Sequence, residues 1–73
     1  MKESKSERFR RLAEARTNKI LLSIISLGKL SNKSNYEYKE TDVDKIFNTI
    51  EKELRKQREL FTQEKRKERR FKL

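Results

Sequence analysis

Residues 20–27 read ILLSIISL, the densest apolar stretch in a chain in which 45% of the residues are charged. Successive side chains on a helix are turned by about 100°, so the apolar residues of this stretch cover an arc of about 220°. A single partner helix covers only about 100° of such an arc. The stretch therefore predicts a helix that needs more than one neighbour to hide its apolar surface.

The composition limits how the chain stabilises itself. Its 73 residues form one domain, 1–73, and a domain of this size rarely buries enough apolar surface without disulfides, a metal or association. Cysteine and histidine are both absent, which excludes disulfides, thiolate metal sites and the commonest transition-metal ligand. We therefore expect no cofactor and no metal, and association is the remaining means of stabilisation.

The first helix is expected at about residues 5–27. Proline is absent and Gly28 is the single glycine, a composition that predicts an all-α fold of long helices. Ser4 and Glu7 have the spacing of a helix-capping box, with Ser6 as an alternative cap. Gly28 is expected to end the helix in the left-handed conformation that glycine adopts without strain.

A loop at residues 28–41 should separate two helices. The stretch KLSNKSNYEYKET, residues 29–41, is rich in Ser and Asn, whose side chains favour turns. Thr41 and Asp44 repeat the capping-box spacing, so a second helix is expected from about residue 42 to 62 or beyond. A basic tail, residues 63–73, follows.

The second helix carries a narrow apolar stripe. Its residues alternate in steps of four and three, with Gln57 at the one skipped position. The residues of the stripe are Val43, Phe47, Ile50, Leu54 and Phe61. A stripe of this width covers about half of the apolar arc at residues 20–27.

We expect a two-helix antiparallel hairpin that dimerises into a four-helix bundle. Leu21, Leu22 and Ile25 lie on the side of the first helix that the second helix leaves open, so they are the expected interface of a homodimer. One alternative is that the loop lays Leu30 and its two tyrosines over this side. Another protein or a membrane surface is the remaining possibility, and a membrane is disfavoured because the basic and apolar residues are separated along the helix rather than on opposite faces.

The positive charge is concentrated at the two ends of the chain. Residues 1–19 carry seven Lys or Arg against three Glu, and residues 62–73 carry six against two, whereas residues 42–61 are balanced. In an antiparallel hairpin these two basic segments share one end. The expected cluster consists of Arg8, Arg10, Arg11, Arg16, Lys19, Lys65, Arg66, Lys67, Arg69 and Arg70.

Gathering like charges is unfavourable unless an anionic partner relieves the repulsion, and the phosphate backbone is the usual one. The sequence therefore predicts nucleic-acid binding, with DNA rather than RNA as the expected partner. The competing interpretation is that the Lys and Arg residues only keep the helix ends soluble. A cytoplasmic location is expected, because cysteine is absent and no apolar signal segment follows Met1.

The stretches RFRRLAEARTNKIL and LSNKSNYEYKETDVDKIFNTIEKEL, within residues 8–54, resemble small helical proteins of phages and plasmids of low-GC Gram-positive bacteria. The resemblance implies an accessory role in a mobile element, either as a small DNA-binding protein or as an inhibitor of a host defence protein. No binding residue is carried over from it, because the resemblance is one of overall pattern.

Two functions follow from these observations. The first is a small basic protein that binds the phosphate backbone through the basic ends of its helices. The alternative is an inhibitor or adaptor that docks on another protein through its apolar helix surface or through the loop with Tyr36 and Tyr38. We do not expect an enzyme, because no histidine is present and the carboxylates lie among charged, exposed positions.

Overall fold

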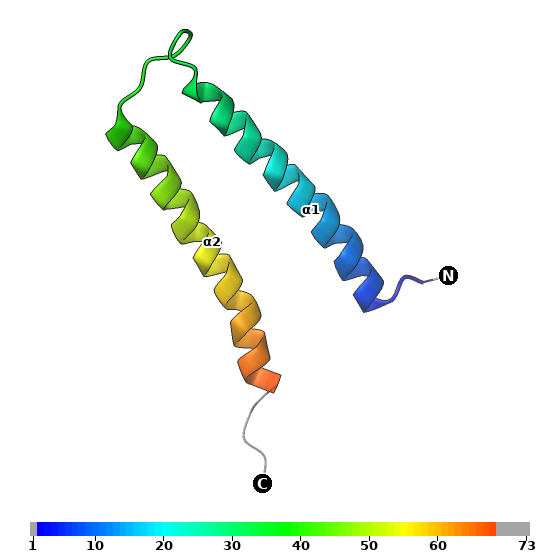
Figure 1. The fold of residues 1–73 in the computed structure, drawn as a ribbon. Coiled ribbons are helices and arrows are strands. Elements are labelled where there is room, and N and C mark those ends of the chain that lie inside the picture. Colours follow the sequence, from blue (N-terminus) through cyan, green and yellow to red (C-terminus); the bar gives the residue numbers. More distant parts are fainter. Residues whose placement is uncertain (1, 69–73) are drawn as a thin grey trace. The chain divides into compact units, whose positions relative to one another are not determined.

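The structure, a computed structural model, describes residues 2–68, with side chains described through Lys65. The elements are α1 (Lys5–Gly28), a short 3-10 helix η1 (Lys29–Ser31) and α2 (Glu40–Glu68). Figure 1 shows the two long helices, α1 and α2. No strand occurs between residues 2 and 68, so the predicted all-α fold with two long helices is confirmed. The chain divides into two units, Met1–Glu37 and Tyr38–Leu73, and each is described by itself.

Ser4 caps the start of α1. Its backbone is extended, and its side-chain oxygen accepts a hydrogen bond of 3.1 Å from the backbone N–H of Glu7. The carbonyl of Ser4 accepts a second bond, of 2.9 Å, from the N–H of Arg8. These bonds satisfy amide groups that have no partner inside the helix, and they decide for Ser4 over Ser6 as the cap.

The end of α1 differs from the prediction. Gly28 has φ −62° and ψ −26°, the right-handed helical conformation, so the expected left-handed cap is wrong. The chain instead tightens into η1, and the N–H of Lys29 donates to the carbonyls of Ile25 and Leu27. A tightened last turn satisfies terminal carbonyls without a left-handed residue, which is why glycine is not required at this position.

A turn built on Asn32 follows η1. The Asn32 side-chain oxygen accepts a bond of 3.0 Å from the N–H of Ser34. The backbone carbonyl of Asn32 accepts bonds of 3.1 and 3.0 Å from the N–H groups of Asn35 and Tyr36. The stretch rich in Ser and Asn thus forms the turn that its composition predicted, with one side chain imitating a backbone acceptor.

α2 begins earlier than predicted. The carbonyl of Lys39 accepts bonds of 3.1 and 3.2 Å from the N–H groups of Asp42 and Val43, and Glu40 is the first helical residue. Thr41 lies within the first turn, so its predicted role as the cap is wrong. Two acidic residues in the first turn, Glu40 and Asp42, interact favourably with the helix dipole and stabilise this earlier start.

α2 also extends beyond residue 62, to Glu68. The residues that it adds, QEKRKE at 63–68, mostly favour the helix and include no helix breaker. The first part of the predicted basic tail is therefore the end of a helix, while residues 69–73 lie outside the described residues.

The large apolar side chains of both helices are mostly exposed. Among residues 2–65, whose side chains are described, none is buried. Leu12, Leu27 and Val43 are half-buried, and the larger apolar side chains of both helices are exposed. Because most of the stability of a helix in a protein comes from the packing of its apolar face, these faces need a partner for the helices to be stable.

Candidate nucleic-acid interface

Five of the predicted binding residues lie on α1, and all five side chains are exposed. They are Arg8, Arg10, Arg11, Arg16 and Lys19. Their positions on the helix are not equivalent, because steps of 100° per residue distribute them around its circumference. The structure therefore divides the predicted cluster into groups with different surroundings.

One group forms a continuous basic face. Arg8, Arg16 and Lys19 fall within an arc of about 80°, and Lys5 falls in the same arc. We call Lys5, Arg8, Arg16 and Lys19 the α1 basic stripe. None of the four side chains has a hydrogen bond or ion pair within the described part of the chain. Lys5 was missed by the sequence reasoning, although its three-residue spacing to Arg8 was a signal that placed it on this face.

Arg11 is engaged by an acidic neighbour. Its Nε and Nη2 atoms donate to the two carboxylate oxygens of Glu3 at 2.8 and 2.9 Å, a bidentate ion pair across eight residues of sequence. These hydrogen bonds raise the pKa of the Arg11 guanidinium above its ordinary value, against a small opposing desolvation. The fork that would grip a phosphate is therefore already occupied by a carboxylate.

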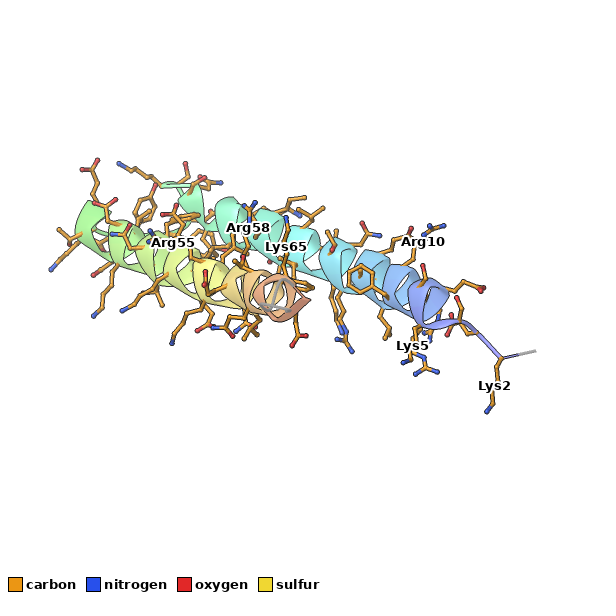
Figure 2. All side chains as sticks on the ribbon, turned by 90° about the horizontal axis from the view of Figure 1, so that it is seen from below. Lys2, Lys5, Arg10, Arg55, Arg58 and Lys65 are labelled. Atoms are coloured by element: carbon orange, nitrogen blue, oxygen red, sulfur yellow. The ribbon has the colours of Figure 1, made fainter. Side chains whose placement is uncertain are left out.

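Arg10 lies away from the α1 basic stripe. Figure 2 shows Lys5 and Arg10 on opposite sides of α1. Arg10 borders a shallow, open depression that is also lined by Glu3, Glu7 and Glu14. Three carboxylates repel an anion, so this side of α1 is a poor site for a phosphate.

The predicted residues at the other end of the chain are described only in part. Lys65 is an exposed residue near the end of α2, with no hydrogen bond or ion pair in the described part of the chain. Arg66 and Lys67 belong to the helical backbone of α2, and nothing is described of their side chains. Arg69 and Arg70 lie outside the described residues.

The predicted interface residues of α1 form an exposed apolar surface. Leu21, Leu22 and Ile25 expose 50, 67 and 57% of their surface. Leu30 and Tyr36, which also belong to the first unit, are themselves 47 and 49% exposed. Within the first unit, the loop therefore does not bury this surface, unlike in the alternative arrangement.

The described residues give little support to two other kinds of site, a metal centre and a membrane-spanning helix. No group of three or more His, Cys, Asp or Glu able to hold a metal ion occurs among them. No helix within the same range has the length and apolar character that crossing a membrane requires. Comparisons with protein families, curated proteins and solved structures find no match for this chain.

Proposed function

We propose that this chain binds nucleic acid, DNA in preference to RNA, by contacting the phosphate backbone with the basic ends of its helices. The observation that carries the proposal is the α1 basic stripe, four exposed cations on one face of one helix with no acidic partner among the described residues. Exposed cations gathered on one face produce the positive potential that attracts a polyanion. Phosphate contacts of this kind supply most of the sequence-independent affinity for DNA.

The length of the stripe fits several phosphates. From Lys5 to Lys19 the helix rises by about 21 Å, at 1.5 Å per residue. Phosphates of one DNA strand lie about 3.4 Å apart along the duplex axis, so the four side chains span several of them. Phe9 borders the stripe and is 60% exposed, so an aromatic ring stands beside the cations.

The basic end of α2 adds to the same function in the proposed arrangement. In an antiparallel hairpin, the start of α1 and the end of α2 lie at one end of the molecule. Lys65 would then stand near the α1 basic stripe, together with the cations of residues 66–73. This arrangement accounts for the segregation of charge along the chain. The resemblance to small proteins of phages and plasmids is compatible with an accessory role of this kind in a mobile element.

The decisive experiment is a salt titration of duplex binding followed by fluorescence anisotropy. We expect the logarithm of the affinity to fall against the logarithm of the salt concentration with a slope steeper than about −4. A triple variant, Lys5→Gln, Arg8→Gln and Arg16→Gln, should reduce this slope by about 3, because each lost phosphate contact removes about 0.9. Truncation after Thr62 should also weaken binding.

A matched control separates location from net charge. Lys45, Lys52 and Lys56 lie on the face of α2 opposite its apolar stripe, and changing all three to Gln removes the same charge. If the control variant loses as much affinity as the stripe variant, binding depends on net charge alone and the proposed interface is wrong. Wild-type affinity after truncation at Thr62 would contradict the role of the basic tail.

A second candidate function is docking on another protein. The exposed Leu21, Leu22 and Ile25 form an apolar patch with charged residues at one end of the same helix, a pattern typical of a protein-binding surface. In this case a Leu22→Glu variant should lose the biological effect of the protein while its affinity for duplex DNA stays unchanged. If the triple variant of the α1 basic stripe loses duplex binding and has no other defect, the first function is favoured.

A further inference from the structure

The ion pair between Glu3 and Arg11 engages one cation of α1 that the basic stripe does not include. Both oxygens of the Glu3 carboxylate accept hydrogen bonds from Arg11, at 2.8 and 2.9 Å. Glu3 lies outside the helix, before the cap at Ser4, so the ion pair fastens the segment before α1 to the side of its second turn. The three- and four-residue spacings by which charged side chains stabilise a helix do not apply to this pair.

Arg11 stands at the border between two faces of α1. It is the third residue after Arg8, and residues three apart are neighbours on the surface of a helix. Around the circumference, only the short side chain of Ala15 lies between these two arginines in this part of the helix. Glu7 and Glu14 flank Arg11 on its other side. The guanidinium can therefore be directed to the basic face or to the acidic one, and its partner decides which.

The carboxylate of Glu3 binds Arg11 as a phosphate would. Carboxylate and phosphate groups both present two oxygens that match the planar fork of a guanidinium. The Arg11 side chain is 60% exposed, so an anion from outside the chain can reach it. Glu3 nevertheless neutralises its charge and engages one pair of its donors.

An exchange of Glu3 for a phosphate gains little. Arg11 would break one bidentate contact with an anion to form another of the same kind, and the Glu3 carboxylate would be left unpaired near a polyanion. Arg8 loses nothing on binding a phosphate, because it has no hydrogen bond or ion pair among the described residues. The two neighbouring arginines are therefore expected to contribute unequally to binding.

A role in the stability of α1 explains the ion pair less well. The start of the helix is already capped by Ser4, whose side chain and carbonyl accept hydrogen bonds from the backbone of Glu7 and Arg8. Exposed ion pairs contribute little to the stability of a protein. The contact between Glu3 and Arg11 therefore matters more for the charge that α1 presents than for its folding.

We propose that Glu3 is a built-in competitor for the phosphates of nucleic acid. It holds Arg11 out of the interface, and its removal adds Arg11, beside Arg8, as a fifth phosphate-binding cation of α1. This inference rests on the proposed function, because the α1 basic stripe must bind the duplex for the competition to matter. The affinity for DNA is thereby kept below the value that the arginines of α1 permit.

Removal of the Glu3 carboxylate tests the proposal. In Glu3→Gln, Arg11 can contact a phosphate, so the salt slope of duplex binding, followed by fluorescence anisotropy, should become steeper by about 0.9. The affinity at physiological salt should rise by about two- to fivefold, the range that exposed ion pairs contribute. Addition of Arg11→Gln to this variant should abolish both gains, because Arg11 makes the added contact.

Glu14→Gln is the matched control. It removes the same negative charge from a residue that lines the same depression as Glu3 and Arg11, but it leaves their ion pair intact. The salt slope of this variant should equal that of the wild type. Equal steepening in Glu3→Gln and Glu14→Gln would show a general effect of net charge and overturn the proposal. Steepening in Glu3→Gln that persists without Arg11 would overturn it as well.

The same measurements separate this inference from the proposed function. If the wild-type chain binds the duplex with a steep salt slope and Glu3→Gln has the same slope, the proposed function holds and Glu3 is not a competitor. If neither chain binds the duplex, both are overturned. The ion pair is checked in the free chain by nuclear magnetic resonance, because the Nε–H of Arg11 should exchange with water more slowly than that of Arg8. Equally fast exchange would show that Glu3 does not hold Arg11.

Discussion

Gly28 occupies a right-handed helical conformation with open space around it. Apart from the neighbouring residues and the backbone of its own helix, a methyl group added at its α-carbon would meet no atom within 4 Å. Because glycine loses more backbone freedom on folding than alanine, Gly28→Ala should raise the free energy of unfolding by about 0.5–1 kcal/mol. Thermal and urea unfolding followed by circular dichroism measure this change. A loss of stability in this variant would mean that Gly28 takes a left-handed conformation in the folded protein.

Arg8 and Arg11 form a matched pair of arginines on one helix. Arg8 is unpaired in the described residues, whereas Arg11 binds both oxygens of Glu3. Alanine at either position removes one positive charge, yet Arg8→Ala should reduce the salt slope of duplex binding by about 0.9, and Arg11→Ala by clearly less. Anisotropy titrations of the two variants side by side make the comparison. An equal or larger effect at Arg11 would show that a phosphate displaces Glu3.

At the scale of the element, α1 combines a basic stripe near its start with an apolar surface near its end. Burying a leucine contributes about 1.5–3 kcal/mol, so Leu22→Glu should weaken any association through this surface by tenfold or more. Ser23→Glu is the control, because residue 23 is turned toward the opposite side of the helix. Sedimentation equilibrium distinguishes the two variants. Association of the Leu22 variant at wild-type strength would exclude this surface from the interface.

The two helices differ in how their charge is arranged. On α1 four of the cations share a face while the acids Glu7 and Glu14 stand on another, which favours contact with a polyanion. On α2 one flank carries Asp44 and Glu51 in its first half and Arg58 and Lys65 in its second half. The position of each charge around the helix, and not the residue type alone, therefore decides which kind of partner a helix face favours.

At the scale of the whole molecule, stability should depend on concentration. None of the side chains in residues 2–65 is buried, although the packing of an apolar face supplies most of the stability of helices in proteins. Dilution should therefore lower both the helical content and the midpoint of thermal unfolding. Far-UV circular dichroism over a hundredfold range of concentration tests this dependence, with a single-chain monomeric helical protein as the control. A helical content that does not change would mean that the monomer is stable alone.

The local features of this protein were determined by its sequence. The scarcity of glycine and proline, the cap at Ser4, the turn at Asn32 and the apolar periodicity of residues 43–61 all depend on residues within a few positions of one another. Short-range hydrogen bonds and the helical repeat are sufficient to predict such features. The candidate stripe was predicted only in part, because the list of cations included Arg10 and Arg11 with the others.

Only the three-dimensional structure decided the conformation of Gly28, the start of α2 at Glu40 and the partner of Arg11. In each case two arrangements of similar free energy compete: a left-handed cap against a tightened turn, one start residue against another, and a free guanidinium against a bidentate ion pair. Differences of this size are smaller than those that propensity and spacing resolve. They depend on which groups come within hydrogen-bond reach once the backbone has folded.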